Sequence, residues 1–126
     1  MMEGILQSLL AMLNDIDSAL RHFMAAYWME TADYVYPSFE DAASAFAYSE
    51  SISTVKSLIS ELSDESIAHW MVDDHVFPNK KQMAFWRGLG ARWITKSQAH
   101  VLIGFLRARV ANVSAHSSGN YTDRFR

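Results

Sequence analysis

Hydrophobic residues recur at alternating intervals of three and four along the N-terminal part of the chain. This spacing places them on one face of an α-helix, so the sequence predicts a long helix from Glu3 to about Met29. Further apolar positions widen the stripe, which favours the central helix of a bundle, although about four heptads leave self-association open. The residues of the stripe are Leu6, Leu9, Leu13, Ile16, Leu20, Phe23 and Tyr27.

Shorter helices are predicted further along, each introduced by a residue that can cap it. Ser38 precedes a helix rich in alanine, and its hydroxyl can accept a hydrogen bond from the first turn. The apolar phase slips before Ile52, where a new stripe predicts a kink or a second helix. Ser63 is expected to cap another short helix, and residues 72–78 form a polar loop after it.

Two capping-box patterns mark the helices of the final third. Asn79 and Gln82 stand three residues apart, and so do Thr95 and Gln98, which allows each pair to exchange side-chain and backbone hydrogen bonds. The second of these helices is predicted to run to about Ala111. The segment after it, residues 116–126, has no periodicity and is predicted to be a flexible C-terminal tail.

No segment alternates apolar and polar residues with the period of two that is typical of strands. The fold predicted is therefore all-α, a single-domain bundle of five to seven helices over residues 1–115 with a long N-terminal helix. A chain of 126 residues is long enough to bury one ordinary core.

The composition limits the chemistry and the location of the protein. There is no cysteine, which excludes disulfides, thiolate metal sites and a cysteine nucleophile. The N-terminus lacks a basic region before its apolar residues and carries Glu3, which argues against a signal peptide. No apolar run approaches the roughly 18 residues that a membrane span needs. We therefore expect a soluble, cytoplasmic protein.

Charge is distributed very unevenly along the chain. Residues 1–79 carry thirteen acidic and two basic residues, whereas residues 80–126 carry nine basic residues and one acidic residue. The net charge of −3 therefore hides a strongly acidic part followed by a strongly basic part. Such an asymmetry indicates a polyanionic partner or head-to-tail attraction between copies. The alternative is that the two parts neutralise each other within one compact fold.

The basic stretch 80–109 is the candidate functional site. Lysine and arginine can neutralise phosphates, and arginine and tryptophan can stack on bases. On the last helix Lys96, His100 and Arg107 fall on one line, and the start of that helix offers backbone N–H groups to an anion. We predict a non-catalytic nucleic-acid-binding protein, a small subunit of a nucleoprotein complex that contacts the phosphate backbone of single-stranded or duplex DNA or RNA without sequence specificity. The candidate residues are Lys80, Lys81, Arg87, Arg92, Trp93, Lys96, His100, Arg107 and Arg109.

Two further interpretations involve other proteins or base readout. The acidic part could make the chain a protein-interaction module, an inhibitor or an adaptor, although its acids form no dense run. Residues 84–97 also match a helix-turn-helix weakly, because Arg87 and Ser97 stand where that motif requires apolar packing. Trp93 is expected to be the partly exposed aromatic residue of the stretch.

Metal binding and catalysis are less well supported by the sequence. Glu65, His69 and Asp73 would share one face of a helix and could hold a transition-metal ion, but no established metal motif accompanies them. There is no GxSxG elbow and no glycine-rich phosphate loop. The sequence therefore predicts no enzyme activity, no cofactor and no metal.

Overall fold

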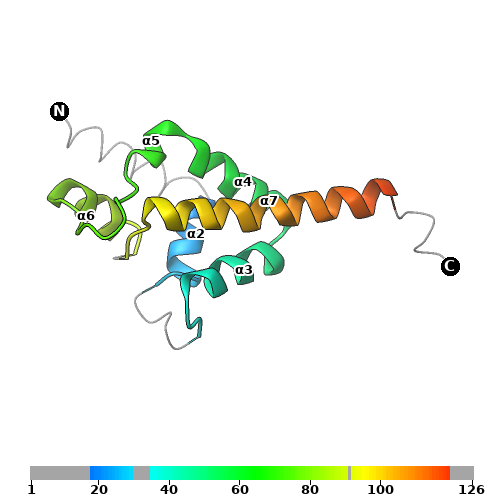
Figure 1. Cartoon of the computed structure of the whole chain (residues 1–126), viewed down its shortest axis with the longest axis horizontal. Helices are drawn as coiled ribbons and strands as arrows, with labels where there is room; N and C mark the ends of the chain where they lie inside the picture. Colours follow the sequence, from blue (N-terminus) through cyan, green and yellow to red (C-terminus); the bar gives the residue numbers. More distant parts are fainter. Residues whose placement is uncertain (1–17, 30–34, 91, 120–126) are drawn as a thin grey trace.

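The structure, a computed structural model, describes residues 18–29, 35–90 and 92–119, with side chains as far as Ser114. It is all-α over these residues, as predicted, and the part described holds an isolated bridge between Val72 and Thr95 but no strand. Helix α7 forms the long axis of the molecule, α3 and α4 pack along it, and α2 crosses it between them (Figure 1). The helices are α2 (Ala19–Ala26), α3 (Phe39–Ser49), α4 (Ile52–Ser63), α5 (Glu65–Ala68), α6 (Lys80–Arg87) and α7 (Lys96–Gly119).

The predicted N-terminal helix is interrupted at Ser18. Ser18 has an extended backbone (φ −74°, ψ 130°) and acts as the N-cap of α2, so no single helix passes through this position. The carboxylate of Glu61 on α4 accepts hydrogen bonds from the Ser18 hydroxyl and from the backbone N–H groups of Ala19 and Leu20, which completes the cap. The rest of the predicted helix, residues 1–17, lies outside the described residues.

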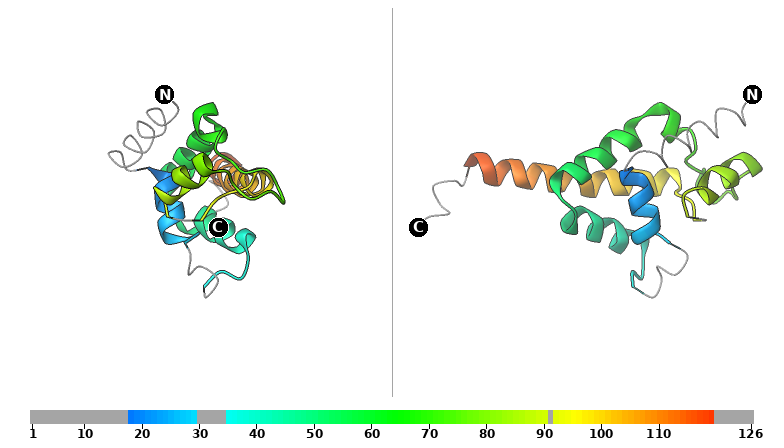
Figure 2. Two further views of the ribbon diagram at one scale, coloured as in Figure 1. Left: turned by 90° about the vertical axis from the view of Figure 1, so that its left-hand side faces the viewer. Right: turned by 180° about the vertical axis from the view of Figure 1, so that it is seen from behind.

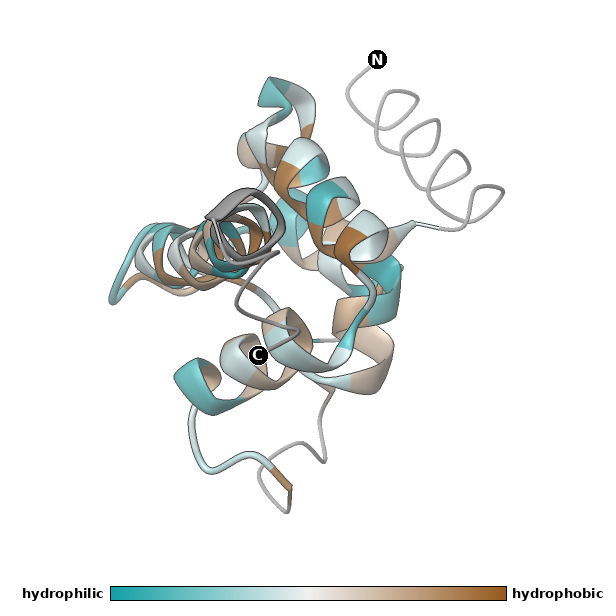
Figure 3. Ribbon diagram, turned by 90° about the vertical axis from the view of Figure 1, so that its right-hand side faces the viewer, coloured by the Kyte–Doolittle hydropathy of each residue, from teal (hydrophilic) through white to brown (hydrophobic). Residues whose placement is uncertain are grey.

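The core is built from inward faces that match the predicted stripes. Figure 3 shows hydrophobic and hydrophilic bands alternating along α4, as expected of an amphipathic helix. An aromatic cluster joins α2 to α3, since the ring of Phe23 lies 5.5 Å from that of Phe46 and 5.9 Å from that of Phe39. The fully buried residues also include Leu58, Leu102 and Leu106, which connect α4 with α7.

The predicted caps near α3 and α4 are partly confirmed. The Ser38 hydroxyl accepts from the N–H of Asp41. Helix α3 ends at Ser49, and its C-cap Glu50 has an extended backbone, so the slip in phase is a true break between two helices. The new stripe is α4, with Ser51 as its cap. The cap of α5 is Asp64 rather than the predicted Ser63, because the Asp64 carboxylate receives the N–H of Ser66.

Residues 72–96 leave the bundle and return to it, and we call this segment the α6 lobe. Its base is closed where the Val72 N–H donates to the carbonyl of Ile94 at 3.0 Å and the Lys96 N–H donates to the carbonyl of Val72 at 2.9 Å. The predicted capping box of Asn79 and Gln82 is present in full. The lobe lies at the N-terminal end of α7, on the far side of the molecule from the end of that helix (Figure 1 and Figure 2).

Helix α7 is longer than the sequence predicts. Its capping box is confirmed, because Thr95 and Gln98 exchange hydrogen bonds of 3.0 and 3.1 Å. The helix continues to Gly119 instead of ending near Ala111, and it extends past α3 and α4 (Figure 2). It thus includes residues 116–119, for which the sequence predicts a tail; residues 120–126 lie outside the described residues. None of the helices described is both long enough and apolar enough to cross a membrane.

Candidate nucleic-acid interface

Three cations of the candidate site lie exposed on α6. Lys80 and Lys81 occupy the first two positions of the helix and Arg87 its last turn. Residues 75–95 contain four lysines and arginines and no acidic residue. Among the described residues, Lys80, Lys81 and Arg87 make no ion pair. Lysines at a helix N-terminus also oppose the helix dipole, so the first turn carries an excess of positive charge that an external anion would relieve.

The lobe is held firmly to the bundle behind these cations. The indole N–H of Trp86 donates to the backbone carbonyl of Trp70 at 2.9 Å, and both residues are buried. The ring of Phe85 stacks on that of Trp70, with centroids 5.1 Å apart and planes 6° from parallel. Gly90, at φ +150°, lets the lobe approach α2 so closely that a Cβ there would lie 3.3 Å from the carbonyl oxygen of Met24. The α6 cations therefore stand on a fixed support.

Arg92 faces inward rather than outward. Its guanidinium carbon lies 3.9 Å from the centre of the Trp28 ring, a cation–π contact between the lobe and the end of α2. The indole N–H of Trp28 donates to the backbone carbonyl of Trp93 at 3.1 Å in the same region. Arg92 is half-buried in this contact, so its place in the fold is that of a packing residue.

Trp93 is half-buried, which confirms the prediction of partial exposure. Its ring makes an edge-to-face contact with the ring of Phe77, whose centroid lies 5.4 Å away at an interplanar angle of 67°. Phe77 itself is 71% exposed, the most exposed large hydrophobic residue of the described chain. Phe77 was not among the residues predicted from the sequence. The available signal was an aromatic residue in a polar loop with no helical stripe to join.

Lys96 is engaged by the chain's own carboxylates. Its ammonium lies 2.5 Å from an oxygen of Asp73, and this contact raises the pKa of Lys96. Asp74 accepts from both the hydroxyl and the N–H of Ser97, which lowers the pKa of that carboxyl. The loop before α6 thus already supplies the negative charge that the start of α7 attracts. Asp73 and Asp74 therefore take the place of the bound anion that the sequence predicts at the N-terminus of α7.

Arg109 is also used inside the protein. Its Nη1 donates to the backbone carbonyls of Ala47 and Glu50, the second at 3.3 Å. Its guanidinium lies 5.9 Å from the centre of the Tyr48 ring. A cation at carbonyls of the last turn is a favourable helix C-cap, so Arg109 fastens α7 to the end of α3.

His100 and Arg107 remain exposed on α7, on the line that the sequence predicts. Gly104 stands between them, and a Cβ there would meet no atom within 4 Å, so the line faces open space. Arg107 lies about 16 Å along the helix from Lys96, given a rise of about 1.5 Å per residue. The nine candidate residues are therefore not gathered on one surface. Lys80, Lys81 and Arg87 form an exposed lobe group, and His100 and Arg107 form an exposed pair on α7. Trp93 is half-buried against Phe77. The remaining three, Arg92, Lys96 and Arg109, are engaged by other groups of the protein, although Lys96 is itself exposed.

Most of the described carboxylates of the acidic part accept hydrogen bonds or form an ion pair within the protein. Glu61 caps α2, Asp64 caps α5 and Asp74 binds the start of α7. Asp41 accepts from the Ser38 hydroxyl at 3.0 Å. Several of these acids therefore contribute to helix starts, and Asp41, Asp64 and Asp74 remain exposed while they do so.

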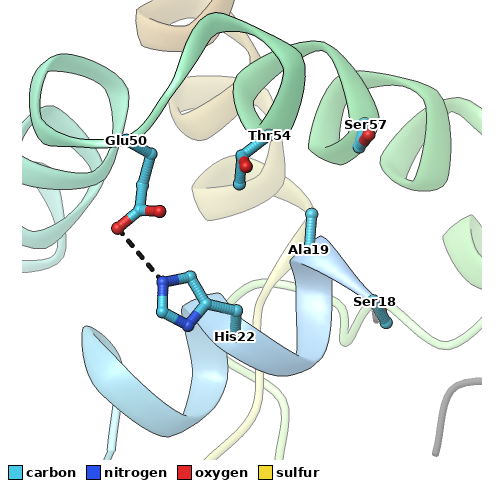
Figure 4. Close-up of a pocket in the computed structure, with 6 residues that line it drawn as sticks. All are labelled: Ser18, Ala19, His22, Glu50, Thr54 and Ser57. Carbon is cyan, nitrogen blue, oxygen red and sulfur yellow. Dashed lines mark ion pairs between the residues drawn. The ribbon is translucent and has the colours of Figure 1, made fainter. Parts of the chain in front are cut away.

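A polar pocket of about 260 Å³ lies between α2 and α4. In Figure 4, His22 of α2 points toward Glu50, and their closest atoms, Nε2 and Oε2, lie 3.1 Å apart. The same carboxylate oxygen accepts from the Tyr27 hydroxyl at 2.6 Å. Burial and this hydrogen bond raise the pKa of Tyr27, whereas the bonds from Tyr27 and His22 lower the pKa of Glu50. The residues lining the pocket are Ser18, Ala19, His22, Glu50, Thr54 and Ser57.

Within the part of the chain that the structure describes, the pocket contains no serine–histidine pair. Among the described residues, no hydroxyl hydrogen-bonds to His22, so the lining serines and Thr54 are not activated as a serine–histidine pair would be. The network of His22, Glu50 and Tyr27 instead connects α2 to the junction of α3 and α4.

The residues of the hypothetical metal site do not share a helical face. Helix α5 ends at Ala68, so the spacing of Glu65, His69 and Asp73 along one helix does not exist. The ring of His69 packs against the edge of Trp70 at 5.3 Å, while Asp73 pairs with Lys96. In the described ranges no group of three or more potential ligands is placed to hold a metal ion.

A helix-turn-helix is also contradicted. Helices α6 and α7 are separated by residues 88–95, whereas that motif joins its helices through a turn of about three or four residues.

Comparison of the chain with protein-family models, with curated proteins and with solved structures gives no significant match.

Proposed function

We propose that the protein binds nucleic acid without catalysis, by gripping the phosphate backbone as a small subunit of a nucleoprotein complex. Lys80, Lys81 and Arg87 of the α6 lobe are the primary contacts. The observation that carries this proposal is the exposed, acid-free group of three cations on a helix fixed to the core. His100 and Arg107 form a second, separate point of contact further along α7.

The proposal assigns a limited number of phosphate contacts. With three lobe cations engaged, log affinity for duplex DNA should fall with log salt at a slope of about −2.7, and for a single strand at about −2. Arg92 and Arg109 contribute little to this slope, because their guanidinium groups are committed to Trp28 and to the carbonyls of α3.

Single charge reversals provide a matched test. Lys81→Glu on the lobe and Lys56→Glu on α4 make the same change of charge at exposed helical lysines. Binding of short DNA and RNA oligonucleotides is measured across salt concentrations, with circular dichroism confirming that each variant is folded. The lobe variant is expected to lose affinity and to reduce the salt slope by about one, while the α4 variant stays close to wild type. Equal losses for both variants, or no binding by wild type at low salt, would refute the proposal.

A further inference from the structure

The exposed ring of Phe77 lies against the half-buried ring of Trp93, three residues before the first cation of α6. Phe77 is 71% exposed, although burying a phenylalanine ring away from water is favourable. The edge-to-face contact with Trp93 covers only part of the ring. Val76, next to it, is 56% exposed, so the tip of this loop presents an apolar surface to solvent. An aromatic ring held outward in this way suits a flat apolar ligand.

The position of Phe77 is set by rigid neighbours. The Val76 N–H donates to the carbonyl of Asp73 at 3.2 Å, which closes a turn, and His75 in that turn has φ +62°. Pro78 follows with a fixed φ and is buried beneath the loop. Trp93, on the other side, is tied to the bundle by the bond from Trp28 to its carbonyl. The ring is thus held in its exposed position before any ligand binds. Binding then avoids the entropy cost of ordering this loop.

Cations follow this ring at once in the chain. Lys80 and Lys81 stand three and four residues after Phe77, at the first turn of α6. A strand of nucleic acid offers both complementary groups, since its bases can stack on the ring while its phosphates meet the lysines. In a duplex the base faces are already covered by neighbouring pairs, so the ring has no face to stack on, while the phosphates remain available to the cations.

The geometry points to Phe77 as a stacking platform that makes the α6 lobe selective for single-stranded nucleic acid over duplex. This inference rests on the proposed function, and it adds the class of nucleic acid and the residue that selects it. The contact is made with the face of a base and carries no sequence specificity, because every base has such a face.

Four variants test the platform. Phe77→Ala removes the ring, Phe77→Leu keeps apolar bulk without a flat face, and Phe77→Tyr keeps the face. Tyr48→Ala is the control, since it removes a ring that is 53% exposed on α3. The probes are a short single strand, a duplex of the same length and an abasic strand that keeps the phosphates and lacks the bases. Circular dichroism checks the fold of each variant.

Loss of stacking should weaken single-strand binding by Phe77→Ala and Phe77→Leu roughly fivefold to a hundredfold. Binding of the duplex and of the abasic strand should change less than about twofold, because these probes contact the cations and not the ring. Phe77→Tyr and Tyr48→Ala should bind like wild type. In wild type, the abasic strand should bind more weakly than the strand that carries bases.

The two proposals fail in different ways. If Lys81→Glu weakens binding and Phe77→Ala does not, the platform is refuted while the phosphate-binding function stands. If Phe77→Leu binds as well as wild type, the contact is apolar packing and stacking is refuted. If wild type binds none of the probes at low salt, both proposals are refuted.

Discussion

The Ser18 hydroxyl donates a hydrogen bond of 2.6 Å to the carboxylate of Glu61, forty-three residues away in the chain. The same carboxylate receives two backbone N–H groups of the first turn of α2. A glutamate on one helix therefore completes the cap of another, and it joins α2 to α4 at the point where the predicted long helix is interrupted.

Removing this shared cap should cost substantial stability. Glu61→Ala leaves the first N–H groups of α2 and the Ser18 hydroxyl without their acceptor, so we expect a loss of about 2 to 3 kcal/mol in the free energy of unfolding. Glu65→Ala, which removes an exposed glutamate from the first turn of α5, should cost less than about 1 kcal/mol. Urea denaturation of both variants measures the difference. Equal losses would mean that the cap contributes nothing beyond general charge.

The hydrogen bonds to Glu50 predict how stability depends on pH. The bonds from Tyr27 and His22 lower the pKa of Glu50 below its ordinary 4.5 in the folded state. The unfolded chain therefore takes up a proton first as the pH falls. The stabilisation is present above about pH 4.5 and is lost as the pH drops through the folded-state pKa.

Tyr27→Phe tests this dependence, because the Tyr27 hydroxyl is the largest cause of the lowered pKa. The variant should show a smaller loss of stability between pH 5 and pH 3 than wild type does, as measured by urea denaturation at each pH. Tyr36→Phe is the control, since Tyr36 stacks on Tyr27 and has no described hydrogen bond to Glu50. An unchanged pH profile in Tyr27→Phe would show that the titration of Glu50 does not cause the loss of stability at low pH.

Local signals in the sequence predicted the fold well. The caps at Ser38, Asn79 and Thr95 were predictable because each cap and its partner stand three residues apart. Glu61 gave no such signal, since its partners at Ser18 are distant in sequence and become neighbours only when α2 packs on α4. The same limit explains why the break at Ser18 was missed.

The candidate site was predicted less well, for a related reason. Closeness in sequence does not make side chains share a surface. Arg92, Lys96 and Arg109 are close to the exposed cations in the chain, but Trp28, Asp73 and the carbonyls of α3 draw them inward or engage them. Only the packed structure separates the cations that are free to meet a ligand from those that hold elements together.

Arg92 and Arg87 should therefore respond differently to truncation. Arg92→Ala removes the half-buried contact with Trp28, and we expect a loss of about 1 to 2 kcal/mol in the free energy of unfolding. Arg87→Ala alters an exposed side chain and should stay within about 0.5 kcal/mol of wild type. Thermal and urea unfolding measure both. For nucleic-acid binding the order should reverse, with Arg87→Ala the weaker binder.

Two glycines of the basic stretch, Gly90 and Gly104, predict opposite effects of the same substitution. Gly90 has φ +150°, and an added Cβ would lie 3.3 Å from the carbonyl oxygen of Met24. Gly90→Ala therefore strains the backbone and pushes the lobe from α2, and it should cost about 1 to 3 kcal/mol in the free energy of unfolding.

Gly104 is in the middle of α7, where a Cβ would meet nothing within 4 Å. Gly104→Ala should raise the free energy of unfolding by about 0.5 to 1 kcal/mol, because alanine restricts the unfolded chain and favours helix. Urea denaturation of the two variants side by side distinguishes them, and a destabilised Gly104→Ala would show that something in the complete chain packs against this part of α7.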